Sequence, residues 1–414
     1  MPTEKHITGT TDVSDLAAEL QAKKLQLHWL LQISKAINYN FTTKQLLDVY
    51  EHVLHSQLKV ERLALLIHEH HWKCALLYGT DKGFHNFDLE KILEELNVVH
   101  DLETEKELWI KSFDTIIPVF HKDQVLAYAL IGGMKDSVIP KKNELIPFIQ
   151  TITNLIVVAI ENNTVSAEKI RQAGIKKELE LAAQMQNMLF PVSLPVNDKY
   201  KLHATYLPHQ EVGGDYYDYI ELNEQECMIC IGDISGKGIA AALLMANFQA
   251  SVRSYSEQQP SVSALIESLN SRVNEITKGE KYITFFLAKF NFVTRQFQYV
   301  NAGHNPAVLY HEGNMRLLDE GCTILGMFEK LPYVHVQSFT LSSEFVLFCY
   351  TDGLTDIEND NKKSIELDEI LQFIEKNKSL SPEQLNRGIV DYLVDFKGNK
   401  LINDDVSMLT CKFY

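Results

Sequence analysis

The chain has 414 residues, of which 45% are hydrophobic and 23% are charged, and its formal net charge is −16. This length suffices for two or three domains, and the composition is typical of a globular protein with a sizeable core. An acidic surface repels phosphate backbones and anionic lipid, which argues against nucleic acid and membranes as partners. We expect no membrane-spanning segment, no signal peptide and a cytoplasmic protein whose six cysteines are reduced.

Two cysteines form a CxxC pair, Cys227 and Cys230, inside an apolar, strand-like run. Residues three apart on a strand point to opposite faces, and no second CxxC or paired His follows. The pattern therefore predicts buried thiols and no zinc or redox centre.

The first block of the chain follows a short tail or helix at residues 1–24 and spans residues 25–162. Apolar residues at helical spacing predict a helix over residues 25–40 and a second one over 43–58, capped near Thr42. Four strand-like runs follow at 62–69, 73–79, 114–124 and 125–135, the last two joined by a polar turn, and a helix over 143–163 closes the block. Helices flanking clustered strands indicate an α+β domain.

The order of these elements, with the run TIIPVF…VLAYALIGG, resembles a GAF domain, a small-molecule sensor module. The resemblance implies a sensor domain that either binds a small-molecule ligand or serves as a dimerisation unit with an empty pocket. Both alternatives stay open, because neither a cyclic-nucleotide signature nor a cysteine placed for a bilin is found.

Residues 163–190 are rich in strong helix formers and predict a helical linker that stops at Phe190 and Pro191. Its spacings of four and three residues fit a parallel coiled coil between two protomers, with polar residues interrupting the apolar row. A helix packed on its own C-terminal domain is the alternative. The positions concerned are Ile170, Gly174, Lys177, Leu181, Gln184 and Met188.

The third block, residues 191–414, alternates many strands with two long helical stretches and a later acidic helix pair near 365–396. This pattern predicts two stacked β-sheets with helices outside, an α-β-β-α sandwich. The whole chain is therefore expected to be α+β.

Four acidic motifs stand at strand ends in this block, centred on Asp215, Asp233, Asp352 and Asp404. A buried, unpaired carboxylate costs several kcal/mol, so four in one domain need a common counter-charge. The oxygen-only ligand set favours two Mg²⁺ or Mn²⁺ ions over Zn²⁺. Two such ions activate a bridging water for attack on phosphorus, which predicts a phosphatase without a Cys or Ser nucleophile.

Seven ordered motifs between residues 179 and 410, among them EVGGDYYD, GDISGKGIAAALLMA, YVNAGHNPAVL, YTDGLTD and NDDVSMLT, resemble the bacterial PPM-type phosphatases of the SpoIIE/RsbU kind. The resemblance implies that Asp233 bridges both metals with help from the Ile234 carbonyl, that Asp215 binds the second metal, and that Asp352 and Asp404 complete the first. It also implies a Ser/Thr phosphoprotein substrate of the STAS-type anti-sigma-factor antagonist class. Regulation is implied too, with the helix before Pro191 positioning the helix after Gly238.

Other residues near these motifs are candidates for substrate contact or support: Gly214, Lys237, Gly353, Asp405 and His304. His304 is read either as an acid or substrate contact or as a loop residue, and Asp405 competes with Asp404 for the ligand role. The wider type-2C phosphatases have a His after the bridging Asp-Gly and a phosphate-binding Arg, and neither is found here, which leaves protonation of the leaving oxygen open.

The sequence thus favours a metal-dependent protein-serine/threonine phosphatase, regulated by the GAF-like block and homodimeric through that block and the linker. A phosphatase-like scaffold without turnover is the alternative. A two-metal nuclease is disfavoured by the charge of −16.

Overall fold

The computed structural model describes residues 10–68, 71–80, 100–101, 112–121, 124–134, 142–259 and 261–414. The chain divides into two compact units, residues 1–173 and 174–414, and each is described by itself. The start of the predicted tail, residues 1–9, and the turn predicted at residues 122–123 lie outside the described residues.

The N-terminal unit is built on a five-stranded antiparallel sheet with the order β2-β1-β5-β4-β3. The four expected strands are present within one to three residues of their predicted limits. The strands are β1 (Arg62–His68), β2 (Trp72–Tyr78), β3 (His100–Asp101), β4 (Thr115–His121) and β5 (Gln124–Gly132).

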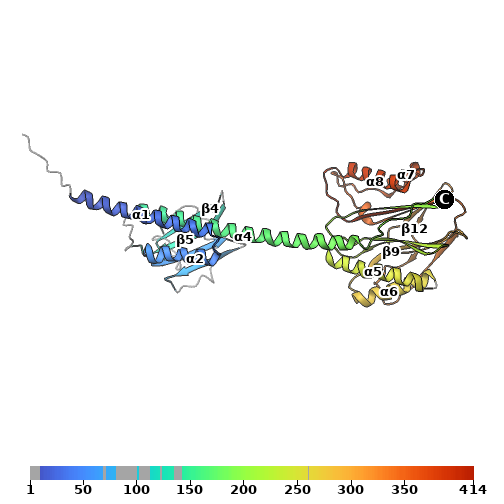
Figure 1. Ribbon diagram of the computed structural model, residues 1–414, viewed down its shortest axis with the longest axis horizontal. Helices are drawn as coiled ribbons and strands as arrows, with labels where there is room; N and C mark the ends of the chain where they lie inside the picture. Colours follow the sequence, from blue (N-terminus) through green and yellow to red (C-terminus); the bar gives the residue numbers. More distant parts are fainter. Residues whose placement is uncertain are drawn as a thin grey trace, which may run out of the picture. The chain divides into compact units, whose positions relative to one another are not determined.

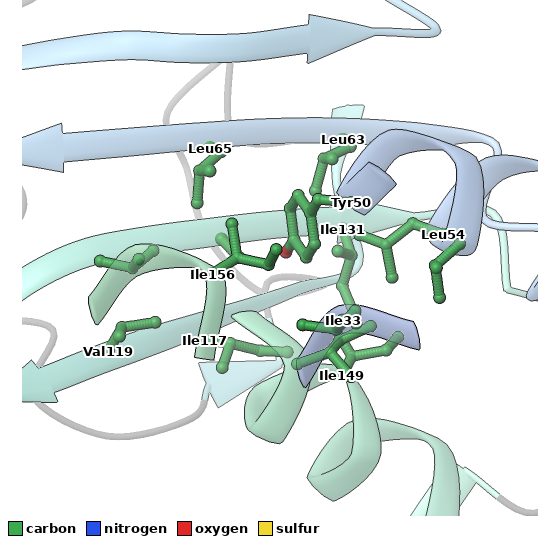
Figure 2. Packing of buried hydrophobic residues seen from close by; sticks show 14 of the residues in the cluster. Ile33, Tyr50, Leu54, Leu63, Leu65, Ile117, Val119, Ile131, Ile149 and Ile156 are labelled. Atoms are coloured by element: carbon green, nitrogen blue, oxygen red, sulfur yellow. The ribbon is translucent and has the colours of Figure 1, made fainter. Parts of the chain in front are cut away.

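Helices α1 (Thr10–Asn38), α2 (Thr43–Glu51) and α4 (Lys142–Asn187) pack with this sheet around one apolar core. Thr42 caps α2 through a capping box with Gln45, and a π-helical turn, η1 (His52–Gln57), follows α2. Figure 2 shows the ring of Tyr50 among Leu63, Ile131 and Ile156. The phenol of Tyr50 forms a 2.6 Å hydrogen bond with Thr153 of α4, which offsets the cost of burying this polar group.

Helix α4 differs from the prediction, because the closing helix and the linker form one continuous helix of 46 residues. By length and composition alone, its stretch Glu144–Asn187 meets the criteria for a membrane span, which corrects our expectation that no segment would. Half of its most apolar window is buried, and Ile149, Ile152 and Ile156 lie in the core of the N-terminal unit. A core helix passes the same test as a spanning one.

The C-terminal unit contains two antiparallel-rich sheets. One has the order β13-β10-β9-β8-β7, with β14 on β10, and the other has the order β12-β11-β15-β16-β6. The first comprises β7 (Tyr216–Asn223), β8 (Glu226–Ile234), β9 (Ile283–Asn291), β10 (Gln296–Ala302), β13 (Gly321–Cys322) and β14 (Gln337–Thr340). The second comprises β6 (Tyr200–Leu207), β11 (Ala307–His311), β12 (Asn314–Leu318), β15 (Phe345–Tyr350) and β16 (Val406–Phe413).

Two helix pairs cover the outer faces of these sheets, as Figure 1 shows within this unit. Helices α5 (Ile239–Gln258) and α6 (Val262–Thr277) share a core with the first sheet, and α7 (Leu367–Lys376) and α8 (Pro382–Lys397) share one with the second. A third, aromatic-rich cluster fills the space between the sheets. The four-layer α-β-β-α arrangement expected for residues 191–414 is therefore present.

The CxxC pair behaves as strand geometry requires. Cys227 belongs to the cluster between the sheets, whereas Cys230 belongs to the cluster under α5 and α6. Burial raises the pKa of the Cys227 thiol to about 12, so neither geometry nor charge suits this pair to metal binding.

Candidate functional site

The four motif aspartates come from both sheets and meet at one end of the sandwich. Asp215 directly precedes β7 and Asp233 lies near the end of β8, in the first sheet. Asp352 opens the short 3-10 turn η4 (Asp352–Leu354) after β15, and Asp404 stands two residues before β16. The start of β7 and the end of β8 thus lie near the start of β16 and the end of β15, so residues far apart in sequence form one site.

The carboxylates repel one another across this site. Burial and, in decreasing order, the charges of Asp352, Asp404 and Asp405 together raise the pKa of Asp233 to about 7. Burial and Asp233 raise the pKa of Asp215 well above its usual value, while hydrogen bonding from Ser407 and Thr351 acts in the opposite direction. A cation placed among these groups would relieve both the burial cost and the repulsion.

Two glycines beside the aspartates permit close approach of the backbone. A Cβ on Gly214 would stand 2.8 Å from the Ile234 carbonyl oxygen and 3.2 Å from Oδ1 of Asp233. A Cβ on Gly353 would stand 2.0 Å from the Asp405 carbonyl oxygen. Any side chain at these positions would push the Asp233 and Asp404 segments away, which explains why glycine occurs in both motifs.

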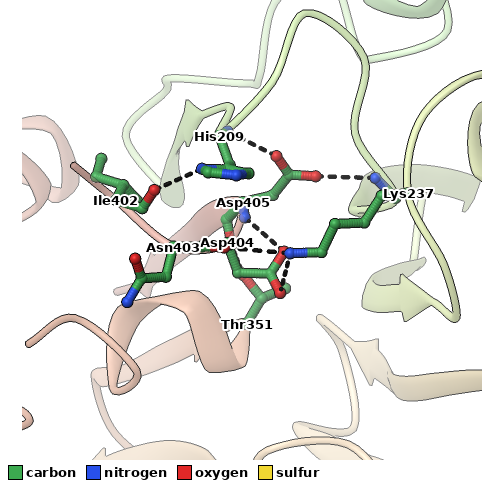
Figure 3. Close-up of polar contacts among 8 residues, drawn as sticks. His209, Lys237, Thr351, Ile402, Asn403, Asp404 and Asp405 are labelled. Carbon is green, nitrogen blue, oxygen red and sulfur yellow. Dashed lines mark hydrogen bonds and ion pairs between the residues drawn. The ribbon is translucent and has the colours of Figure 1, made fainter. Parts of the chain in front are cut away.

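Asp404 and Asp405 have different environments although they are adjacent (Figure 3). Asp405 is 8% exposed, and its two carboxylate oxygens accept from the backbone N–H of His209 at 2.8 Å and of Gly214 at 2.9 Å. Asp404 is half-buried and forms a 3.0 Å ion pair with Lys237. Both oxygens of Asp405 are thus used to hold the loop before Asp215. The carboxylate of Asp404 instead faces the ammonium group of Lys237.

Lys237 brings a positive charge to these carboxylates. Its ammonium also donates to the Asn403 carbonyl at 3.1 Å, and its charge lowers the pKa of both Asp233 and Asp352. The side chain is half exposed, so it reaches the site from the solvent side.

Two supporting residues were not predicted from the sequence. Thr351 is fully buried and donates to Oδ2 of Asp215 at 2.9 Å. Gln186, at the end of α4, is 4% exposed and pairs with the backbone of Gly213. Thr351 could have been suspected because it directly precedes Asp352, but nothing in the helical pattern marks Gln186.

His304 stands behind the carboxylates and not among them. Its Nδ1 is 2.9 Å from the Thr284 hydroxyl, and Thr284 pairs with Asp233 across β8 and β9. Its backbone N–H donates to Asn301 at 2.7 Å. Burial lowers the pKa of His304 to about 4, so the ring is neutral at pH 7 and unsuited to donate a proton to substrate. These contacts favour the alternative of a loop residue.

Asp218, three residues after Asp215, has a structural role of its own. It is fully buried and receives two hydrogen bonds from Arg253 of α5, at 2.7 and 2.8 Å. Tyr216 adds a third at 2.9 Å. Asp218 therefore anchors α5 to β7.

The donor set suits hard divalent cations, since it consists of carboxylate and backbone oxygens. The side chains are close enough to perturb one another's pKa values. Across the residues that the structure describes, however, no three Asp, Glu, His or Cys side chains are already gathered around one point as metal ligands. Binding would require small side-chain rotations, such as that of Asp404 away from Lys237.

The C-terminal unit is similar to known proteins. Residues 223–414 match the family Stage II sporulation protein E (SpoIIE). The chain is 26% identical over 243 residues to phosphoserine phosphatase RsbU of Bacillus subtilis, a match that covers 58% of this chain and 71% of RsbU. It is 28% identical over 186 residues to phosphoserine phosphatase RsbP of the same organism, covering 44% of this chain and 46% of RsbP.

Among solved structures, the SiaA-PP2C domain of Pseudomonas aeruginosa aligns with a TM-score of 0.53 at 17% identity, covering 59% of this chain and 99% of that domain. Because the sequence identity is only 17%, this similarity is evidence about the fold alone. It agrees with the four-layer sandwich described above.

Proposed function

We propose that the C-terminal unit, which matches the SpoIIE family over residues 223–414 and is similar to RsbU, is a PPM-type protein-serine/threonine phosphatase domain. It hydrolyses phosphoserine or phosphothreonine on a regulatory protein through a site that holds two Mn²⁺ or Mg²⁺ ions. The substrate class is a small STAS-type antagonist of an anti-sigma factor. The observation that carries this proposal is the mutual repulsion of Asp215, Asp233, Asp352 and Asp404 at one end of the sandwich.

The ligand roles follow the positions of these residues. Asp233 lies near the end of β8 in the first sheet, and its pKa is raised by the charges of Asp352 and Asp404 next to the second sheet. It would therefore serve as the ligand that the two ions share. Asp215 and the Ile234 carbonyl would be the metal ligands from the first sheet. Asp352 and Asp404 would be the ligands from the second sheet. When bound, the ions supply an activated water and neutralise charge on the phosphoryl oxygens.

Other side chains of the protein position the ligands and the substrate. Asp405 and Thr351 fix the Asp215 segment through buried hydrogen bonds, so this carboxylate is held in place before substrate arrives. Lys237 is half exposed beside Asp404 and is placed to contact a substrate phosphoryl group. His304 is neutral and buried, so the proton for the departing serine oxygen comes from water at the site.

We further propose that the N-terminal unit is a GAF-like sensor that regulates this activity and that the protein is a cytoplasmic homodimer. Support for dimerisation comes from α4, on which Ile170, Leu181, Met185 and Met188 are 53–77% exposed. Apolar residues this exposed at helical spacing favour pairing with a second copy. A small-molecule ligand of the N-terminal unit is part of the same proposal.

Phosphate release from p-nitrophenyl phosphate and from a phosphoserine peptide, with Mn²⁺, with Mg²⁺ and with EDTA, tests the proposed reaction. We expect release that depends on the divalent cation and that falls at least a hundredfold in Asp233→Asn. The exposed Asp319 provides a matched control, and Asp319→Asn should retain full activity. Release that persists in EDTA, or in Asp233→Asn, would exclude the proposed site. A folded protein that binds its phosphoprotein partner without turnover would support the scaffold alternative.

A further inference from the structure

The turn between β8 and α5 has a second lysine next to it, Lys281, which comes from the loop before β9. A Cβ on Gly236, whose φ is +105°, would stand 2.9 Å from Nζ of Lys281, so the ammonium group of Lys281 lies beside this turn. The loop is tied to the turn through the backbone of Tyr282. Its carbonyl accepts from the Ser235 N–H and its N–H donates to the Ser235 hydroxyl, both at 3.0 Å. The position of Lys281 is therefore coupled to the turn that follows Asp233.

The ammonium group of Lys281 is exposed and is available to an incoming anion. Within the ranges that the structure describes, no carboxylate lies at ion-pair distance from its Nζ, although the chain has 55 acidic residues against 39 Lys and Arg residues. Lys237, which directly follows Gly236, differs because it is paired with Asp404 at 3.0 Å (Figure 3). Two cations thus border one turn, the first in contact with a candidate ligand and the second beyond ion-pair distance of the carboxylates.

Exposed apolar side chains flank the same turn. Ile239 opens α5 directly after it and is 47% exposed, and Tyr282 is 46% exposed. Met327 is 52% exposed and lies two residues after Leu325, which pairs with Ile283 at the start of β9. Large apolar side chains that stay half exposed beside a candidate active site favour a protein over a small phosphate ester as the substrate, because a protein covers them when it binds.

We propose that Lys281 is a specificity-determining residue, which selects phosphoserine segments that carry an acidic side chain within a few residues of the phosphoserine. The phosphoryl group is bound at the candidate site beside Lys237, and a neighbouring Asp or Glu of the substrate pairs with Lys281. This attraction offsets part of the repulsion between an acidic substrate and a chain whose net charge is −16. The inference rests on the proposed function, and it assigns Lys281 no contact with the reacting atoms.

Phosphate release from three phosphoserine peptides tests this inference on the full-length protein with Mn²⁺. The peptides differ only in the residues on both sides of the phosphoserine, which are Glu, Gln or Lys. For the wild type we expect kcat/KM to be about threefold to fivefold higher with the Glu peptide than with the Gln peptide, which is the effect of an exposed ion pair. The difference should lie mainly in KM, because Lys281 does not touch the reacting atoms. Added NaCl should reduce the ratio, since the pair is exposed to solvent.

Charge reversal at Lys281 gives the sharpest comparison. Lys281→Glu should reverse the order, so that the Lys peptide becomes a better substrate than the Glu peptide, whereas Lys281→Arg should keep the wild-type order. Each ratio is taken within one variant, which cancels any general change in rate. Lys199→Glu is the matched control and should keep the wild-type ratio. Lys199 is exposed and directly precedes β6, at the end of the sandwich opposite to the aspartates.

The outcomes separate this inference from the proposed function. If wild-type protein cleaves all three peptides with equal kcat/KM, or if folded Lys281→Glu still prefers the Glu peptide, the role of Lys281 is wrong and the proposed function stands. If wild-type protein and Lys281→Glu both prefer the Lys peptide, the aspartates select the substrate and the role of Lys281 is again wrong. Wild-type protein that releases phosphate from none of the peptides contradicts the proposed function itself. Should Lys281→Glu not fold, Lys281→Gln decides, because it should lose the preference for the Glu peptide.

Discussion

The Thr351 hydroxyl donates a 2.9 Å hydrogen bond to Oδ2 of Asp215, joining residues that are 136 positions apart in the chain. The same hydroxyl accepts from the Ser407 N–H at 2.9 Å. Thr351 directly follows β15, Ser407 lies in β16 and Asp215 directly precedes β7. One side chain therefore ties the two sheets together at the point where the candidate ligands meet.

Replacing Thr351 by Val tests how much these hydrogen bonds contribute to the free energy of unfolding. Thr351→Val keeps the shape but leaves the Ser407 N–H and one oxygen of Asp215 without partners in a buried place. We expect the free energy of unfolding in urea to fall by about 2–4 kcal/mol, since each buried unpaired group costs about 1–3 kcal/mol. Thr351→Ser retains the hydroxyl and should lose less than half as much. Equal losses in the two variants would show that the methyl group, and not the hydrogen bonds, matters at this position.

The adjacent carboxylates should respond in opposite ways to neutralisation. Asp405→Asn replaces an acceptor by a donor against a backbone N–H, so we expect the unfolding free energy to fall by about 1–2 kcal/mol. Asp404→Asn removes only a half-exposed ion pair and relieves repulsion with Asp233, so the metal-free stability should stay or rise. Urea unfolding in EDTA compares them. A stability loss confined to Asp404→Asn would reverse our assignment of the two residues.

The buried carboxylate of Asp218 depends on Arg253 for its charge balance. Arg253→Met should lower the unfolding free energy by about 2–3 kcal/mol, less than for a fully buried pair because the Arg253 side chain is 48% exposed and water can enter. Combining it with Asp218→Asn should recover part of the loss, since no uncompensated charge is then buried. A double variant as unstable as the sum of the two single variants would show that the residues act independently.

Metal-free protein should become less stable as the pH rises. The pKa of Asp233 is about 7 in the folded protein against 3.8 as its usual value. The folded state therefore binds this proton more tightly, and that advantage is present at low pH and is lost as the pH rises from about 4 to 7. In EDTA, the difference in urea midpoint between Asp233→Asn and the wild type should be larger at pH 7.5 than at pH 5. An unchanged difference would mean that the pKa of Asp233 is not raised.

Much of the C-terminal fold could be predicted from local pattern. Apolar runs ending in Asp-Gly or Gly-Asp located β8 and β15, and helical periodicity located α5 and α6, because these signals lie within a few residues of each other. The short strands β12, β13 and β14 were missed: they have two to five residues and are defined by their pairing partners. The continuity of α4 was missed because a change from apolar to charged composition was taken as a boundary, although it marks where the helix leaves the N-terminal core.

The charged residues of the candidate site could be predicted from the sequence, whereas the hydrogen bonds that position them could not. Glycine context and motif order singled out Asp215, Asp233, Asp352 and Asp404 as candidate ligands, since these features can be read from neighbouring residues. The difference between Asp404 and Asp405 depends on His209 and Gly214, which lie about 190 residues away. Gln186 and Thr351 likewise take their roles from distant backbone groups, so no local pattern could have assigned them.

The most direct test of the account is the stoichiometry of Mn²⁺ binding measured by calorimetry on wild-type protein and on Asp233→Asn, with Asp319→Asn as the control. We predict two Mn²⁺ ions per wild-type chain and per control chain. Both sites should be lost in Asp233→Asn, because we propose that the two ions share this carboxylate. Wild-type protein that binds no Mn²⁺, or Asp233→Asn protein that binds two ions with unchanged affinity, would contradict the account.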